Sequence, residues 1–401
     1  IDTTFSDFPK IKSLKKAYVF YEFDALYNRS YDTADFFFEL DPFEIDSLDN
    51  FREQTLALDG SLQSAGIFPK FEEKLKIRSD YSFGFIRDAP EDGFDFYGTG
   101  AKYKNEIRLS NMGLQGSGTI KFITSTAVSD NYTFLPDSTV GIAQSYKNIK
   151  QGTPKEFPQA SGKDVYITYV PDDNILKAKS RNTPINMFED EARMRGSIYV
   201  RPNGMTGRGF MDFENAMINS KKFEYGMETI DADTANFDLK SLDSGNIALK
   251  SYNVNAHISF KERKGEFKTN GDETYLKFPE FQYICYMDKF NWYMDSDDIE
   301  LEKERQDISI ETDLDLAGSN FFSIHPDQDS LNFMAPKARL SLKEGTIRCN
   351  EVKYIDVADA RIFPDSSKVI VRKKAKMDPL KNSEIVANYI TKYHKIINAT
   401  T

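Results

Sequence analysis

The chain has 401 residues, of which 40% are hydrophobic, 29% charged and 13% aromatic. Such a composition can fill a folded core and argues against a disordered chain. The formal net charge of −11 leaves no basic field for phosphates, so we expect no nucleic acid partner. Because no run of about 18 apolar residues occurs, we also expect no direct membrane span.

Apolar and polar side chains alternate along most of the chain, which is the pattern of half-buried β-strands. The clearest case is the segment 253–260, where Val254, Ala256, Ile258 and Phe260 are apolar and the residues between them are polar. Less regular alternation recurs, in chain order, at Leu56 and Leu58, Leu75 and Ile77, Ile107 and Leu109, Val165 and Ile167, Phe237 and Leu239, Ile308 and Ile310, and Leu340 and Leu342. Turn residues separate these segments.

An internal repeat is visible at an offset of 91 residues, because the glycine-rich segment 113–118 matches the segment 204–209. The match continues in the same register, from Ser129 to Ser220 and from Phe134 to Tyr225. We interpret this as duplication of a multi-strand unit, with chance similarity of two turns as the alternative. The expected organisation is an N-terminal β region at 1–100, a β-rich body with the repeat at 101–335, and a short-strand array with a helix at 336–401.

Helical periodicity is expected only near the end of the sequence. Ser383 can act as an N-cap, and the apolar residues that follow lie on one face of a helix: Ile385, Val386, Tyr389, Ile390 and Tyr393. Strands without alternating helices predict antiparallel or solenoid sheets. The fold class that we expect is therefore all-β, an antiparallel sandwich or solenoid-like stacked sheets in an elongated body, with one C-terminal helix.

No catalytic, metal-binding or cofactor-binding residue stands out in the sequence. The glycine runs lack the order of a phosphate-binding loop, so we interpret them as turns or bulges that lead into strands. Cys285 and Cys349 are too few for a zinc site and are expected to be small buried hydrophobic residues, while one disulfide between them stays open.

Aromatic residues crowd the segment 278–293, and they are the only candidate site that the sequence offers. Aromatic side chains dominate both protein cores and the buried anchors of interfaces, so both roles stay open for them. The candidate interface or core residues are Phe281, Tyr283, Tyr286, Phe290, Trp292 and Tyr293.

Five segments carry a resemblance to a known family: 59–69 (DGSLQSAGIFP), 113–122, 134–138 (FLPDS), 233–235 (DTA) and 278–288 (FPEFQYICYMD). They resemble the large exported β-rich proteins of Bacteroidetes, a family that includes the plug subunit of the type 9 secretion translocon. The resemblance implies a periplasmic protein associated with the outer membrane, an outer-membrane β-barrel translocon subunit as its partner, no cofactor and no enzyme activity. The first residue, Ile1, fits a mature exported protein or a piece of a longer chain.

These observations lead to one expected function and two rivals. We expect a non-catalytic periplasmic plug or accessory subunit that occludes the periplasmic opening of an outer-membrane protein-secretion channel. The first rival is a periplasmic β-sheet protein that binds or bridges lipid or glycan. The second is a polysaccharide-active enzyme whose two carboxylates come together only on folding.

Overall fold

The computed structural model describes residues 10–22, 30–45, 56–243, 245–271, 274–303, 318–387 and 394–401. Within them the chain consists of β-strands joined by turns and a single 3₁₀ turn, η4 (Pro326–Gln328), which confirms the all-β prediction. The strand expected at Ile308 and Ile310 lies outside the described residues. The described residues include no helix with the length and apolarity needed to cross a membrane.

The chain divides into two compact units. The first unit comprises Ile1–Asn186 and Ser197–Met205, and the second comprises Met187–Gly196 and Thr206–Thr401. Three strands contribute residues to both units: β17 (Ile185–Met187), β18 (Ala192–Arg201) and β19 (Gly204–Asp212). Each unit is described by itself below.

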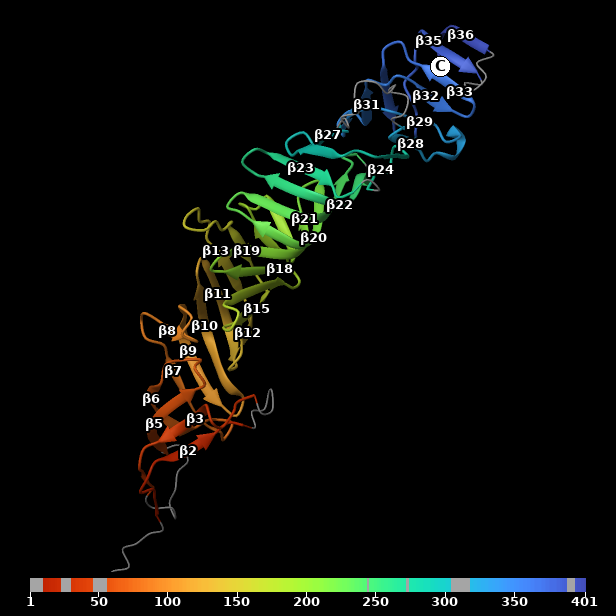
Figure 1. Cartoon of the computed structure of the whole chain (residues 1–401). Helices are drawn as coiled ribbons and strands as arrows, with labels where there is room; N and C mark the ends of the chain where they lie inside the picture. The colour runs from red at the N-terminus through yellow and green to blue at the C-terminus, as the bar shows by residue number, and fades with distance from the viewer. Residues whose placement is uncertain are drawn as a thin grey trace, which may run out of the picture. The chain divides into compact units, whose positions relative to one another are not determined.

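The first unit is built on one long antiparallel ladder. Its other strands are β1 (Ile11–Lys12), β2 (Ala17–Phe20), β3 (Phe36–Leu40), β4 (Glu44–Ile45), β5 (Ala57–Ser64), β6 (Phe71–Ile77), β7 (Phe83–Asp88), β8 (Phe94–Phe96), β9 (Ala101–Ser110), β10 (Gly113–Phe122), β11 (Ser125–Phe134), β12 (Thr139–Ala143), β13 (Ser145–Asn148), β14 (Ala160–Gly162), β15 (Val165–Val170) and β16 (Ile175–Ser180). Neighbours pair in the order β2-β3-β5-β6-β7-β9-β10-β11 (Figure 1).

At β11 this ladder divides into two. The first part of β11, from Ser125 to Val128, pairs with β13, and β13 pairs with β14. The last part, from Tyr132 to Phe134, pairs with β12, which continues through β15 and β16 to β18. One long strand therefore feeds two sheets.

The second unit repeats this arrangement, with long strands up to β22 and short strands beyond it. They are β20 (Ala216–Tyr225), β21 (Thr229–Lys240), β22 (Ile247–Ser259), β23 (Lys264–Thr269), β24 (Leu276–Phe278), β25 (Tyr283–Cys285), β26 (Lys289–Tyr293), β27 (Asp298–Glu302), β28 (Phe321–Ser323), β29 (Asn332–Phe333), β30 (Lys337–Ser341), β31 (Thr346–Asn350), β32 (Ile355–Val357), β33 (Ala360–Phe363), β34 (Lys368–Arg372), β35 (Ser383–Ala387) and β36 (His394–Ala399). Here the division falls on β22.

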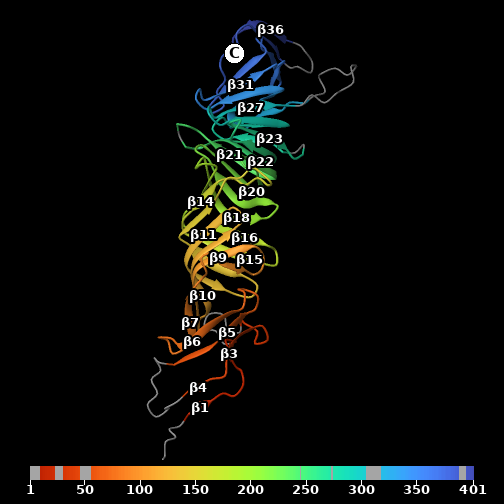
Figure 2. The ribbon, with the colours of Figure 1, turned by 90° about the vertical axis from the view of Figure 1, so that its left-hand side faces the viewer.

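Beyond β22 the chain lays down hairpins alternately in two ladders. Ladder A runs β22-β23-β26-β27-β30-β31-β34, and ladder B runs β22-β24-β25-β28-β29-β32-β33-β35-β36. Figure 1 shows β23 and β27 along one side of this unit and β24 and β28 along the other. Figure 2 shows β23, β27 and β31 following one another within ladder A.

Alternating side chains of both ladders form the core of the second unit. On β26, Phe290 and Trp292 are buried while the residues between and beside them are partly exposed, and on β25, Tyr283 and Cys285 are buried. This is the period of two that a strand imposes on its side chains. The chain thus buries one face of each ladder and presents the other to solvent.

The two cysteines are free thiols in this core. Cys285 lies on β25 of ladder B and Cys349 on β31 of ladder A, and both are buried. Burial raises the pKa of both thiols, and the nearby Cys349 raises that of Cys285 further. They are the small buried residues that the sequence predicts, without a disulfide between them.

Strand boundaries recur at the offset of 91 residues seen in the sequence. β8, β9 and β11 begin and end 91 residues before β17, β18 and β20, and β10 begins 91 residues before β19. The same close contacts recur as well. A Cβ on Gly118 would lie 2.1 Å from the carbonyl oxygen of Lys104, and one on Gly209 would lie 2.3 Å from that of Arg195, so glycine is needed at both places.

A pair of hydrogen bonds made by one serine hydroxyl also recurs between the two repeats. Ser129 Oγ donates to the Ile142 carbonyl oxygen at 2.8 Å and accepts from the backbone N–H of Asn131 at 3.2 Å. Ser220 Oγ donates to the Thr234 carbonyl oxygen at 2.7 Å and accepts from the backbone N–H of Lys222 at 3.1 Å. The serines and the N–H donors lie at the offset of 91 residues, and the acceptor carbonyls lie at an offset of 92. Duplication of a multi-strand unit predicts such similar hydrogen bonds.

The expected C-terminal helix is wrong. Ser383 begins β35 (Ser383–Ala387), and Ile385 and Val386 of this strand pair with β33 and with β36 (His394–Ala399). Tyr389, Ile390 and Tyr393 lie outside the described residues. Short apolar sets fit both periods, and here the free edge of β33 and the β-branched side chains favour the strand.

Candidate binding cleft

The six aromatic residues singled out by the sequence differ in burial and in position. Four are buried with at most 2% of their surface exposed, and two are partly exposed. The buried four are Phe281, Tyr283, Phe290 and Trp292, and the other two are Tyr286 and Tyr293. Three of the six lie on β26 of ladder A, while the other three lie on or beside β25 of ladder B. They do not form one surface.

Rings from three strands pack together around β26. Phe237 of β21 lies 4.5 Å from Phe267 of β23, measured between ring centroids, and Phe267 lies 4.6 Å from Phe290. Trp292 lies 5.4 Å from Phe237 and meets Phe213 edge to face at 5.2 Å. The indole of Trp292 is therefore packed between Phe237 and Phe213 and is only 2% exposed.

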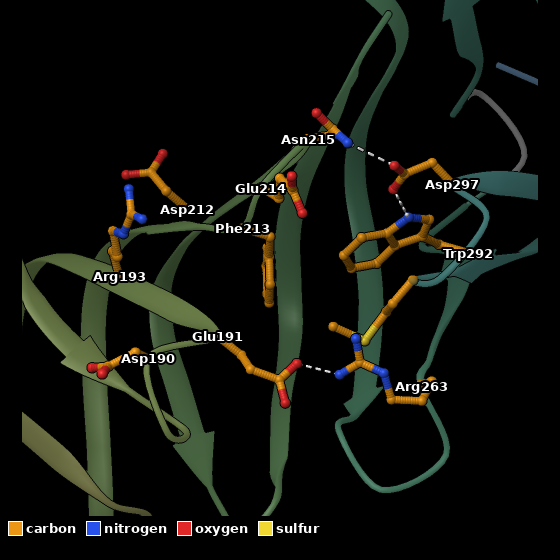
Figure 3. A pocket seen from close by; sticks show the side chains of 11 residues that line it. Asp190, Glu191, Arg193, Asp212, Phe213, Glu214, Asn215, Arg263, Trp292 and Asp297 are labelled. Atoms are coloured by element: carbon orange, nitrogen blue, oxygen red, sulfur yellow. Dashed lines mark hydrogen bonds and ion pairs between the residues drawn. The ribbon is translucent and has the colours of Figure 1, made fainter. Parts of the chain in front are cut away.

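A cleft of about 420 Å³ opens beside this ring cluster in the second unit (Figure 3). It is lined by Asp190, Glu191, Arg193, Asp212, Phe213, Glu214, Asn215, Arg263, Trp292, Met294 and Asp297. Figure 3 shows the ring of Phe213 between the side that carries Asp212 and the side that carries Trp292. The walls are therefore both apolar and charged.

Turns supply most of the lining. Asp190 and Glu191 lie in the turn before β18, Glu214 and Asn215 in the turn before β20, Arg263 in the turn before β23, and Asp297 in the turn before β27. These residues are up to 107 positions apart in the sequence, from 190 to 297. Because hairpins stack in register, their turns gather at the same edge of the unit.

Asp297 is the most constrained carboxylate of the cleft. Its two oxygens accept hydrogen bonds from Asn215 Nδ2 at 2.7 Å and from Trp292 Nε1 at 3.2 Å (Figure 3). Burial raises the pKa of Asp297, although these two donors lower it, and the neighbouring charges of Glu214 and Asp298 raise it further. A half-buried carboxylate with neutral donors is less stable as an anion than one with a cationic partner.

Two of the other carboxylates are neutralised by arginine. Arg263 forms ion pairs with Glu191 and, at 3.0 Å, with Asp295. Both partners raise the pKa of Arg263, and this effect exceeds the opposite effect of its partial burial. Arg195 Nε lies 2.7 Å from an oxygen of Asp212. Asp190 and Glu214 form no ion pair or hydrogen bond through their side chains with any residue that the structure describes.

A second hollow, of about 500 Å³, lies on β20 and β21 around Ser220. Its charged groups largely satisfy one another: Lys222 Nζ lies 2.5 Å from Glu224, and His257 Nδ1 lies 2.6 Å from Asp231. Such a surface offers few groups to a ligand. The cleft beside Trp292 is therefore the stronger candidate.

Sequence reasoning found only Trp292 among the residues of this cleft. Asp298, which follows Asp297 directly, is buried and accepts a hydrogen bond from Arg339 Nη2 at 2.6 Å. Nothing in the sequence links Asp190 to Glu214 or Asp297, because only the fold brings the turns before β18, β20 and β27 to one cleft. Only the one tryptophan of the chain marked the place.

Comparison with protein-family models, with curated proteins and with solved structures finds no match for this chain.

Proposed function

We propose that this chain is a non-catalytic periplasmic protein that acts as a plug or accessory subunit of an outer-membrane protein-secretion channel. It occludes the periplasmic opening of the channel, and an outer-membrane β-barrel subunit is its partner. The proposal rests on the resemblance of five segments to exported β-rich proteins of Bacteroidetes and on the architecture of the second unit.

The observation that carries the proposal is the filled interior between ladders A and B. Phe267, Phe290, Phe321 and Phe333 all point into it and are at most 2% exposed. A close-packed interior resists compression and transmits force, as protein cores do. A body of this kind suits steric occlusion, in which the outward faces of the sheets meet a partner.

The lipid-bridging rival is less well supported by the same observation. A lipid carrier needs an apolar groove that acyl chains can reach, whereas stacked rings fill this interior: Phe321 and Phe333 lie 5.2 Å apart and nearly parallel. The rings therefore leave no space there for an acyl chain. Organic extraction of the purified protein and mass spectrometry of the extract test this directly, and bound lipid in stoichiometric amount would favour the rival.

The mechanism we propose is a change of occupancy rather than a chemical step. The plug binds the open mouth of the channel, and cargo or another subunit competes for the same place. Such a shift needs a difference in affinity of about 5.5 kcal/mol to move the channel from almost fully plugged to almost fully open.

Affinity purification of the channel tests the proposal. The barrel subunit carries a tag, complexes are isolated from cells with and without exported cargo, and this chain is quantified by mass spectrometry. We expect it in complexes without cargo and depleted in complexes that hold cargo. An abundant unrelated periplasmic β-protein serves as the control for carry-over. Absence of this chain from the channel under every condition would refute the proposal.

A further inference from the structure

The cleft beside Trp292 carries an excess of negative charge. Once the pairs of Arg263 and Asp212 are set aside, Asp190, Glu214 and Asp297 have no cationic partner in the described part of the chain. Arg193 is the one lining cation in those ranges without a carboxylate partner. Three carboxylates thus face one guanidinium, and the cleft attracts cations.

The position of Asp297 makes this attraction specific. Its carboxylate is held in place by the indole N–H of Trp292 and the amide of Asn215, both of them neutral donors. A carboxylate fixed in this way has lost part of its hydration without gaining a counter-charge. A cation that enters the cleft supplies the counter-charge that the Asp297 carboxylate lacks. Asp297 is already held in place, so binding loses no side-chain entropy there.

Apolar walls distinguish an organic cation from a small hydrated ion. Phe213 and Met294 line the cleft next to the edge of Trp292. Lysine and arginine carry an aliphatic stem that packs against such groups while the charged head meets carboxylates, and aromatic rings add a cation–π attraction. A small hydrated ion has no aliphatic stem to pack against these walls.

We propose that this cleft binds a lysine or arginine side chain of a protein partner. Glu214 and Asp297 are the ion-pair partners of its charged head, and Phe213 is the wall for its stem. This inference does not depend on the proposed role at a secretion channel, because any protein with an exposed basic side chain could supply the ligand.

Trp292 makes the site observable, because it is the only tryptophan in the chain and its indole N–H contacts Asp297. The probes are the blocked tripeptide Gly-Arg-Gly and its citrulline analogue, which has nearly the same shape and no charge. We expect a saturable change in tryptophan emission with the arginine peptide, weaker at high salt, and no saturable change with the citrulline peptide.

Two variants and a matched control assign the charges. Glu214→Gln should weaken binding about fivefold and Asp297→Asn about tenfold, as expected for partly screened ion pairs. The Glu214 side chain forms no hydrogen bond or ion pair within the described part of the chain, so its variant should fold normally. Asp233→Asn in the second hollow removes an exposed carboxylate elsewhere and should leave binding unchanged.

Three results would overturn the inference. The first is equal binding of the citrulline peptide, which would identify a site for neutral polar groups. The second is undiminished binding by both Glu214→Gln and Asp297→Asn. The third is the absence of a saturable response up to about 10 mM peptide, since even a weak specific contact binds at that concentration.

Discussion

Gly118 is expected to be one of the least replaceable residues of the first unit. It lies on β10, and a Cβ built on it would approach the carbonyl oxygen of Lys104 to 2.1 Å and the hydroxyl oxygen of Tyr103 to 2.8 Å. Contacts of this length do not occur, so β10 must move away from β9 in the variant Gly118→Ala. Overpacking typically costs about 1–3 kcal/mol, and each ladder hydrogen bond weakened adds about 1 kcal/mol.

We therefore expect Gly118→Ala to lower the free energy of unfolding by about 2–4 kcal/mol. Urea denaturation followed by far-ultraviolet circular dichroism measures this change. Gly318→Ala is the matched control, because no atom of the described residues lies within 4 Å of its added methyl group and its backbone is not left-handed. A loss for Gly118→Ala no larger than that of Gly318→Ala would show that β9 and β10 are not packed as described.

Three further predictions concern the second unit. Phe290→Ala should cost about 3–5 kcal/mol in urea denaturation because the ring stacks in a filled core, with Phe290→Leu costing clearly less; equal small effects would contradict that packing. Lys373 lowers the pKa of the Asp243 carboxyl to about 2. The ion pair therefore stabilises the fold at any pH above the pKa that Asp243 has in the unfolded chain, and this contribution disappears as the pH falls towards 2. Asp243→Asn should flatten that part of the acid-unfolding profile, and an unchanged profile would refute the pair. At about pH 8, Cys285 and Cys349 should not react with a thiol reagent until urea unfolds the chain. Fast labelling of the native protein would contradict their burial.

The strands of this fold were predictable wherever one face is buried and the other is wet. Val254, Ala256 and Ile258 of β22 are buried as their alternation predicts, and the residues between Val254 and Ile258 are more exposed. The strand at the end of the chain was not predictable, because Ile385 and Val386 fit a helix face as well as a strand. Pairing with β33 decides between the two, and sequence periodicity contains no record of that partner.

The division of the sheets and the cleft were beyond sequence reasoning for a related reason. Along one edge, β11 and β22 each pair with two different strands, which no local pattern encodes. The cleft depends on that topology, because Glu214 and Asp297 meet only when the hairpins stack. Aromatic density pointed to Trp292, but it reported the core next to the site rather than the carboxylates that form it.

Electrical recording tests the central proposal most directly. The outer-membrane channel, purified without this chain, is reconstituted in a planar lipid bilayer, and the protein is added to the periplasmic side. We predict a stepwise fall in conductance that follows protein concentration and is reversed by washing. Conductance that stays unchanged at saturating protein, with a channel that is open throughout, would contradict the plug.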